Sequence, residues 1–503
     1  MTRRRPWHVL SAAIGLVLIA LFACSAILNH DPTQCSQDSD CDHFGGHPTC
    51  VSGVCQSSGL GPDGCFFGTP TTPEQFANQC STATCEHFDN CARLDECNPD
   101  AALPDPITPP DAPPKPPVDA SLIDAPPPPV LPPCIENGST QTIVIGGSTA
   151  IQPFLNVVAT TLTGYQIAYQ PSGSCTGVDN MFNPDTSKRI LKDIKGKTNL
   201  LFKADGSQTA CTFGGGAPID VAASDVFSST CNGAYMPTPE VADYLGPIQP
   251  MTFVVPATST ETSISAEMAH TVFGRGNTDS DCAPYTDPSL YFVRNASSGT
   301  QQMISKAVQL DAHKWWGVDR GGSTGVRDNL EAVAPDQVDK AIGILSTDFA
   351  DPERDRLRVL AFRAQGATCA YYPDLTQFTK EKANVRNGLY PIWGNVHFYA
   401  NVTNGIPSPA AGALVTKFTL PRPDQALLDA ITHSGLVPSC AMSVQRSEEM
   451  GPLSAFDPPF QCGCYFAANV PSGTAPASCQ VCAGPADCSA DKPACNNGFC
   501  EKK

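Results

Sequence analysis

An arginine and a run of small hydroxyl residues stand together in YFVRNASSGTQQMISKAV, residues 291–308. Arg294 follows three apolar residues, and Ser298, Gly299 and Thr300 precede a segment with apolar residues at helical spacing. Free backbone N–H groups at a helix start, together with the helix dipole, favour a negative charge. Arginine adds a planar fork of donors that suits a tetrahedral oxyanion. The segment therefore predicts half of an anion-binding site, although no carboxylate lies within the turn.

Three further turns place small polar residues between a strand pattern and a helix pattern. They are residues 146–149 (GGST), 171–174 (PSGS) and 224–225 (SD). Serine and threonine are ordinary helix N-caps, and capping is enough to explain any one of these turns. Four such turns in one domain, one of them with an arginine, favour a shared anion site instead.

The composition argues against several classes of function. The 503 residues carry a formal net charge of −18, and a nucleic-acid partner is not expected because phosphate backbones need basic patches. The 24 cysteines, 48 prolines and only 16% charged residues are typical of an exported protein in an oxidising compartment. None of the nine histidines stands in a metal-ligand spacing, so neither a metal nor a cofactor is expected.

One pattern of a catalytic nucleophile, G-x-S-x-G, occurs at residues 321–325. A nucleophile elbow needs a strand before it, a helix after it and an oxyanion loop elsewhere. The preceding residues, HKWWGVDR, do not have a strand pattern, and no HGGG-type loop is present. The chain is therefore not predicted to be an enzyme, and no catalytic residue is assigned.

The N-terminus predicts export and a tether to a membrane. Arginines at positions 3–5 precede an apolar run over residues 9–23, which ends in Leu-Phe-Ala-Cys24. This ending resembles a bacterial lipoprotein box, with residues 1–24 as signal peptide and Cys24 as the lipidated residue. The alternative is an uncleaved membrane helix, because residues 9–28 are long enough to span a bilayer. In both cases the protein is predicted to be extracytoplasmic, in the periplasm or at the cell surface.

Cysteine-rich segments stand at both ends, over residues 31–100 and 460–503. A cysteine spacing in the first segment recurs in the second, with an Asp-Cys pair, then Pro-x-Cys, then Gly-x-Cys. Its members are Cys35, Cys41, Cys50 and Cys55, and Cys482, Cys488, Cys495 and Cys500. We expect small disulfide modules at both ends. A zinc ribbon built from cysteines 462, 464, 479 and 482 is the alternative, which export makes less favourable.

A proline-dense stretch over residues 101–133 separates the first module from the rest. Such a stretch favours polyproline II and predicts a spacer between the anchor and the next domain. Residues 134–450 then alternate strand patterns with helix patterns. The strand patterns cover residues 141–147, 165–170, 219–224, 252–256, 291–295 and 341–346, and the clearest helix patterns cover 151–162 and 301–310. This alternation predicts an α/β domain with helices on both faces of its sheet.

At these turns the chain resembles the extracytoplasmic phosphate-binding proteins of the phosphate ABC transporter, which are class II "Venus flytrap" receptors. The resemblance is carried, in family order, by IGGSTAIQPFLNVVA, YQPSGSCTGVDNM, IDVAASDVF, FVRNASSGTQQMI and AIGILSTDF, over residues 139–405. It implies two α/β lobes that close on an anion. Lobe I would comprise residues 139–247 and 365–450, and lobe II residues 250–364.

The resemblance also implies the ligand-binding residues. Asp225 would accept a hydrogen bond from a protonated phosphate oxygen, since a carboxylate repels fully ionised sulfate. The donors would be Thr149, the backbone of Ala150, Ser174, Arg294, Ser298, Gly299 and Thr300. The implied ligand is inorganic phosphate or a similar oxyanion, and an ABC transporter permease is the implied partner.

Two positions depart from the family pattern. The family turn reads Arg-x-Asp-x-Ser-Gly-Thr, and Ala296 occupies the Asp position, so the choice between phosphate and another oxyanion stays open. Cys175 and the residue after it replace a small Ser-Gly pair, and Cys175 could form a disulfide with Cys211 or Cys231. The predicted function is solute capture for uptake or sensing. The alternative is a surface interaction protein that keeps the fold without transport, which the terminal cysteine modules suit.

Overall fold

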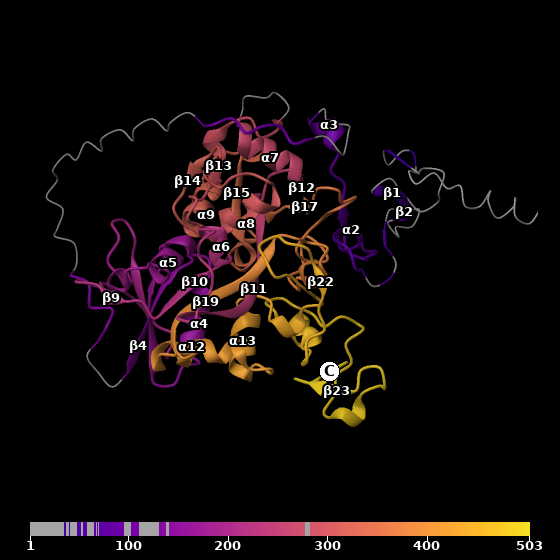
Figure 1. Ribbon diagram of the computed structural model, residues 1–503. Coiled ribbons are helices and arrows are strands. Elements are labelled where there is room, and N and C mark those ends of the chain that lie inside the picture. The colour runs from indigo at the N-terminus through magenta and orange to yellow at the C-terminus, as the bar shows by residue number, and fades with distance from the viewer. Residues whose placement is uncertain are drawn as a thin grey trace, which may run out of the picture. The chain divides into compact units, whose positions relative to one another are not determined.

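The computed structural model describes residues 70–94, 102–109, 130–136, 140–276 and 282–503, with short pieces between residues 35 and 68 (Figure 1). The chain divides into a small unit, residues up to 70 with 78–80, and a large unit, residues 71–77 and 81–503. Cys24 lies outside the described residues. Within the described ranges, no helix combines the length and the apolar character needed to cross a membrane.

The large unit is built on one twelve-stranded sheet, with the hydrogen-bonded order β14-β13-β15-β11-β19-β10-β4-β5-β7-β8 and with β16 and β20 at its side. The strands are β4 (Gln141–Gly147), β5 (Tyr165–Gln170), β7 (Asn199–Phe202), β8 (Gln208–Cys211), β10 (Val221–Ser224), β11 (Val241–Pro256), β13 (Tyr291–Val293), β14 (Val318–Asp319), β15 (Ile342–Ser346), β16 (Leu357–Val359), β19 (Trp393–Thr403) and β20 (Ile406–Pro407).

The order of the strands confirms the predicted fold class. In lobe I, β4 pairs in parallel with β5 on one side and β10 on the other. β19 returns from the end of the domain and lies antiparallel between β10 and β11. Two lobes that share such returning strands are the class II two-lobed binding fold, here with disulfide-rich segments at both ends.

Two long strands, β11 and β19, run side by side and join the lobes (Figure 1). The first half of β11 pairs with β19, and Met251 to Val254 pair with β15 of lobe II. The register shifts between Leu245 and Ile248, where Gly246 and Pro247 interrupt the ladder. The sequence predicts only the apolar end of β11, because its first half mixes polar residues with this Gly-Pro break.

Helices cover both faces of the sheet in each lobe, as the sequence predicts. Along β4, Ile143 and Ile145 contact the layer of α4, α12 and α13, whereas Val144 contacts the layer of α5. In lobe II, α7 and α8 lie on one face and α9 on the other. The bounds are α4 (Gln152–Ala159), α5 (Ser174–Met181), α7 (Ala266–Arg275), α8 (Gly299–Ala307), α9 (Ser323–Glu331), α12 (Pro409–Val415) and α13 (Gln425–His433).

A second sheet, in the order β12-β17-β18-β3, and several short elements complete the large unit. Its strands are β12 (Ser263–Ser265), β17 (Ala361–Arg363), β18 (Ala370–Tyr371) and β3 (Cys85–Glu86). The short elements are α2 (Pro73–Ala77), α3 (Asn90–Leu94), α6 (Ser228–Cys231), α10 (Thr347–Ala350), α11 (Ala383–Asn387), α14 (Gly463–Asn469), and the pairs β6 (Ile190–Leu191) with β9 (Ala217–Pro218) and β21 (Val444–Gln445) with β22 (Ser454–Ala455).

Residues 81–94 belong to the large unit, although the sequence groups them with the cysteine-rich N-terminal module. β3 pairs with β18, and the Cys85–Cys369 disulfide ties the segment to the domain. Phe88 is buried in the main apolar core. The expectation of a separate disulfide module over residues 31–100 is therefore wrong for residues 81–94. Cys85 is bonded to the large unit, and Phe88 packs in the core of that unit.

The described ends of the proline-rich segment are bound to the large unit rather than left free. The Ile107 N–H donates to the carbonyl of Gly274 at 2.8 Å, and the indole N–H of Trp316 donates to the Ile107 carbonyl at 2.8 Å. At the other end, Cys134 forms a disulfide with Cys211. A polyproline II chain has few donors and many unpaired carbonyls, so it pairs readily with donors on a folded surface.

The repeated cysteine pattern has the same backbone pairing at both ends of the chain. β1 (Pro48–Val51) pairs with β2 (Val54–Ser57) so that Cys50 faces Cys55, and β23 (Ala494–Asn496) pairs with β24 (Phe499–Glu501) so that Cys495 faces Cys500. The zinc alternative is excluded, because the cysteines proposed as ligands are all in disulfides. The C-terminal disulfides are Cys440–Cys462, Cys464–Cys479, Cys482–Cys495 and Cys488–Cys500.

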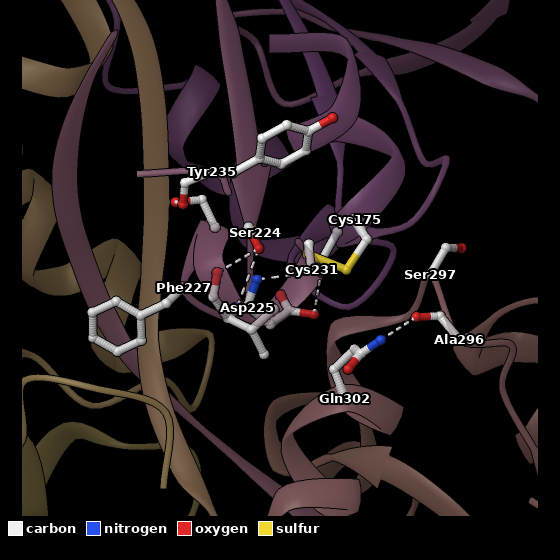
Figure 2. The surroundings of a disulfide bond; sticks show 12 residues. Cys175, Ser224, Asp225, Phe227, Cys231, Tyr235, Ala296, Ser297 and Gln302 are labelled. Atoms are coloured by element: carbon white, nitrogen blue, oxygen red, sulfur yellow. Dashed lines mark hydrogen bonds between the residues drawn. A yellow bond between two sulfur atoms is a disulfide. The ribbon is translucent and has the colours of Figure 1, made fainter. Parts of the chain in front are cut away.

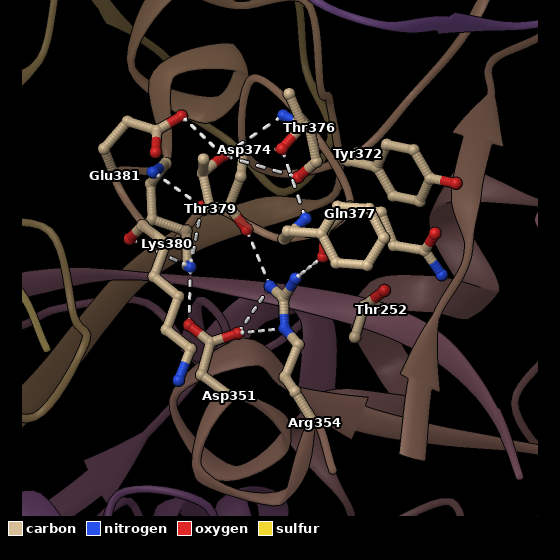
Figure 3. Close-up of polar contacts among 12 residues, drawn as sticks. Thr252, Asp351, Arg354, Tyr372, Asp374, Thr376, Gln377, Thr379, Lys380 and Glu381 are labelled. Carbon is tan, nitrogen blue, oxygen red and sulfur yellow. Dashed lines mark hydrogen bonds and ion pairs between the residues drawn. The ribbon is translucent and has the colours of Figure 1, made fainter. Parts of the chain in front are cut away.

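A buried group of two cations and two carboxylates anchors the loop before α11 (Figure 3). Lys382 Nζ donates to Asp351 at 2.6 Å and to Asp374 at 2.9 Å. Arg354 Nη2 donates to the same two carboxylates, at 2.6 and 2.7 Å. Lys382 and Asp374 are fully buried. The four charges balance, which is the condition for tolerating ions away from water.

Candidate anion-binding site

Arg294 lies just after β13 and is 3% exposed. Its Nη2 donates to Thr149 Oγ1 of lobe I at 2.6 Å, and its Nη1 donates to Ser323 Oγ at 3.2 Å. Its buried Nε has no partner, and it takes part in none of the ion pairs of the described residues. Burial lowers the pKa of Arg294 to about 10, against the opposing charges of Asp225 and Asp319. A buried cation with only hydroxyl partners favours an anion beside it.

Asp225 and Ser174 form the lobe I side of the site. Ser174, the first residue of α5, donates from Oγ to Asp225 Oδ2 at 3.1 Å and accepts from the Asp225 N–H at 3.3 Å. Both residues are buried, and Asp225 Oδ1 has no partner. Burial raises the pKa of Asp225 to about 6, although hydrogen bonds from Ser148 and Ser174 and the charge of Arg294 oppose this rise.

Helix α8 begins directly against these two residues. A Cβ on Gly299 would lie 2.5 Å from Ser174 Oγ and 2.7 Å from Asp225 Oδ2, so no larger residue fits there. Ser298 is the N-cap residue of α8, yet its side chain makes no capping hydrogen bond. Thr300 is fully buried and its Oγ1 has no partner. The hydroxyl groups of Ser298 and Thr300 are therefore not used for capping.

The first predicted turn is only partly available to a ligand. Thr149 Oγ1 contacts Arg294, but the Ala150 N–H donates to Ser148 Oγ at 3.0 Å. The Ser148 N–H donates to the carbonyl of Ala223 on β10, which fixes the turn to the sheet. The structure thus joins Thr149 to Arg294 and Ser174 to Asp225, whereas the backbone donor predicted at Ala150 is already paired.

Ser323 belongs to this site, although its sequence pattern suggests a nucleophile. It is the first residue of α9, is 3% exposed and accepts from Arg294. The short strand β14 does precede it, so the expectation that no strand stands there is wrong. Within the described residues, no histidine or carboxylate is hydrogen-bonded to its hydroxyl. The repeated tetrapeptide GGST, at residues 146–149 and 321–324, is the signal that could have identified it.

Ala296 stands where the resembled sequence pattern has an aspartate. Its carbonyl accepts a hydrogen bond from Gln302 Nε2 at 2.6 Å (Figure 2). Asp319 on the neighbouring strand β14 is the acid of lobe II that acts on Arg294. It also accepts a long hydrogen bond of 3.4 Å from Asn295. Arg294 is therefore held by hydrogen bonds to Thr149 and Ser323, and carboxylates act on it only at longer range.

The Cys175–Cys231 disulfide lies beside the Asp225 turn (Figure 2). It joins the first turn of α5, next to Ser174, to the end of α6, which follows Asp225. Of the two partners considered for Cys175, this is the second, and Cys211 pairs with Cys134 instead. The Cys175 N–H donates to the carbonyl of Ser297 at 3.0 Å, so the two lobes touch at this point.

Replacing both cysteines of this disulfide, as Cys175→Ala with Cys231→Ala, should weaken anion binding about tenfold, because the segments that carry Ser174 and Asp225 then lose their covalent link and keep only noncovalent contacts. The free energy of unfolding should also fall by about 2–4 kcal/mol. The matched control is Cys134→Ala with Cys211→Ala, which opens a loop of similar length in the same lobe. Calorimetry and urea unfolding should show similar losses of stability in both variants but weaker binding only in the first.

Among the comparisons with known proteins, only the one with solved structures finds similar chains. No protein-family model and no curated protein matches the chain. A candidate phosphate ABC transporter substrate-binding protein from Clostridium perfringens, solved with bound phosphate, is 13% identical over 59% of this chain and 99% of that one, with a TM-score of 0.41. An ABC-type phosphate transport receptor from Vibrio cholerae is 12% identical over 59% and 100%, with a TM-score of 0.39. The OxyR regulatory domain from Pseudomonas aeruginosa is 9% identical over 58% and 98%, with a TM-score of 0.31.

Proposed function

We propose that this protein is an extracytoplasmic solute-binding protein that captures a tetrahedral oxyanion, phosphate, between its two lobes for uptake or sensing. One observation carries the proposal: three buried polar atoms without partners belong to the predicted ligand residues. They are Arg294 Nε and Thr300 Oγ1, which can donate, and Asp225 Oδ1, which can accept. A protonated oxyanion satisfies all three, whereas a fully ionised one leaves the carboxylate facing a like charge.

The hydroxyl groups around Arg294 suit the same ligand. Thr149 and Ser323 each accept a hydrogen bond from the guanidinium, so each keeps its own O–H to donate. An anion beside Arg294 would then meet a charged donor and two hydroxyl donors from different lobes. This arrangement would bind an anion only when the lobes are closed.

The compartment and the partners belong to the same proposal. Eight disulfides in the described residues support folding in an oxidising compartment. Tethering through lipidated Cys24 or an N-terminal helix would keep the protein at the membrane, where an ABC transporter permease would receive the anion. Neither a metal nor a cofactor is part of the proposed mechanism.

Titration calorimetry with phosphate and with sulfate, at about pH 5 and about pH 8, tests the ligand and the role of Asp225. Because the pKa of Asp225 is raised to about 6, it is ionised at the higher pH and neutral at the lower one. Phosphate can bring a proton and should bind at both. Sulfate cannot, so it should bind only at the lower pH, where Asp225 itself supplies the proton.

Asp225→Asn should remove this discrimination, because the amide can donate at any pH, and sulfate should then bind the variant at about pH 8. Asp205→Asn changes an exposed acid of the same lobe and should leave both ligands unaffected. If wild-type protein binds neither anion at either pH, the proposal fails. The interaction protein, which the two matching cysteine hairpins favour, would then be the better account.

A further inference from the structure

A second carboxylate, Glu449, lies directly behind the Asp225 turn. Its Oε2 accepts a hydrogen bond from the N–H of Phe227 at 3.1 Å, two residues after Asp225. A Cβ on Gly394 would lie 3.2 Å from Glu449 Oε1 and 3.3 Å from the carbonyl oxygen of Asp225, so the two acids flank one glycine of β19. Glu449 Oε1 is buried and has no hydrogen-bond partner. Glu449 is thus close enough to influence Asp225 both through the backbone and through its charge.

The charged and titratable groups around Glu449 come from three segments. His397 on β19 contacts the Phe227 ring, with 4.3 Å between ring centroids, and its Nδ1 is hydrogen-bonded to Asp243. Arg446, on the same segment as Glu449, lies 4.1 Å from the centroid of the Trp393 ring and forms no ion pair among the described residues. Neither His397 nor Arg446 therefore makes a direct pair with the Glu449 carboxylate.

Asp225 is the third neighbour and the one that carries negative charge. Burial, helped by the charge of Asp225, raises the pKa of Glu449 to about 7, while His397, the hydrogen bond from the Phe227 N–H and Arg446 oppose the rise. Glu449 is therefore neutral below about pH 7 and charged above it. Its ionisation places a second negative charge beside the turn that would face the anion.

We propose that Glu449 is a positioning residue of the anion site, and that capture of the anion is coupled to protonation of its carboxyl group. This inference rests on the proposed function. Neutral Glu449 can still accept from the Phe227 N–H, and it adds no repulsion. Once Glu449 is ionised, an incoming anion meets two like charges, so the anion and a proton are taken up together and released together.

Glu449 also supplies a second acid to a site whose arginine turn has none, because Ala296 stands there. The family pattern places its second acid beside the arginine, where Ala296 now stands. Here the second acid is supplied by residues 446–450 and stands beside Asp225 instead. An acid beside the arginine neutralises a cation, whereas an acid beside Asp225 adds to a negative charge. The acid beside the arginine would stay ionised near neutral pH, so its effect on binding would be constant. The acid beside Asp225 changes its charge in this range, so it makes binding sensitive to pH.

Glu449→Gln tests the inference, because glutamine keeps an oxygen that can accept from Phe227 and imitates the neutral acid. Binding of inorganic phosphate is measured by calorimetry between about pH 6 and pH 8.5 for the variant and the wild type, and the ratio of their affinities cancels the ionisation of phosphate itself. The sign follows from the raised pKa: the favourable neutral form is present below about pH 7 and is lost as the pH rises through that value. The variant should match the wild type at the low end and bind about threefold to tenfold tighter at the high end.

Three further measurements separate the outcomes. Glu448→Gln, a change of the exposed neighbouring acid, should follow the wild-type profile. Glu449→Ala should weaken binding at the low end of the pH range, where the Phe227 N–H loses its acceptor and no repulsion is relieved. Calorimetry in two buffers of different ionisation enthalpy should show more proton uptake for the wild type than for Glu449→Gln. Parallel pH profiles for the wild type and Glu449→Gln would overturn this inference alone, whereas a wild type that binds no phosphate would overturn the proposed function.

Discussion

Arg294→Met is expected to reduce anion affinity by more than about a hundredfold, to below the range of calorimetry. The arginine is a buried charged donor that contacts both lobes at the site, through Thr149 and Ser323. Methionine keeps much of the length and apolar stem of the side chain but removes every donor. Truncating a buried charge in such a position costs about 2–5 kcal/mol of binding free energy, and the part of this range above about 2.7 kcal/mol corresponds to the expected loss.

The same variant should fold at least as well as the wild type when no anion is present. In the ligand-free protein the guanidinium is buried without a carboxylate pair, so its removal relieves a cost instead of creating one. Thermal unfolding should therefore show an unchanged or higher midpoint for the variant, with no further rise on adding phosphate. Arg320→Met removes a partly exposed cation of the same lobe and is the control for net charge. Retained affinity in Arg294→Met would mean that the anion binds elsewhere.

Lys382→Met is expected to lower the free energy of unfolding by about 3–5 kcal/mol, because it leaves Asp351 and Asp374 buried against Arg354 alone. The lysine is fully buried and donates to both carboxylates. Urea unfolding followed by tryptophan fluorescence, with the disulfides intact, measures the change. Lys188→Met, which removes an exposed lysine paired with Asp185, should change stability by less than about 1 kcal/mol.

A double-mutant cycle sharpens this second result. In an Asp374→Asn background one of the two carboxylates is already neutral, so removing Lys382 should cost clearly less than in the wild type. Equal costs in both backgrounds would mean that the lysine stabilises the loop through its packing instead of its charge. Anion affinity should be unchanged in these variants, since the group makes no contact with the predicted ligand residues.

Local patterns in the sequence predict the parts of the fold that depend on local physics. The strands at residues 141–147 and 165–170 appear with the predicted bounds, because each has an apolar centre, residues 143–145 and 167–169, and is ended by glycine or followed by proline. The turns before α5 and α8 follow from small residues at a helix start. Whether the hydroxyl groups of Ser298 and Thr300 cap the helix does not follow from the local sequence. Only the structure shows that neither of them does.

Other features depend on which distant segments meet, and no local pattern contains that information. Ser323 reaches Arg294 because β14 pairs with β13. Glu449 reaches the Asp225 turn from a segment more than two hundred residues later, with no strand or helix pattern of its own. The partner of Cys175 is a choice among many cysteines, which spacing alone cannot make. The sequence therefore predicts the turns that carry the candidate site residues, whereas it does not predict the tertiary contacts that bring Ser323 and Glu449 to them.

The Cys85–Cys369 disulfide turns most of the molecule into a covalent ring. All four turns of the predicted anion site, from Thr149 to Thr300, lie on the chain between these two cysteines. A protease that cuts one exposed loop within the ring opens the backbone but releases no fragment. A single nick would then leave both halves of the predicted anion site joined.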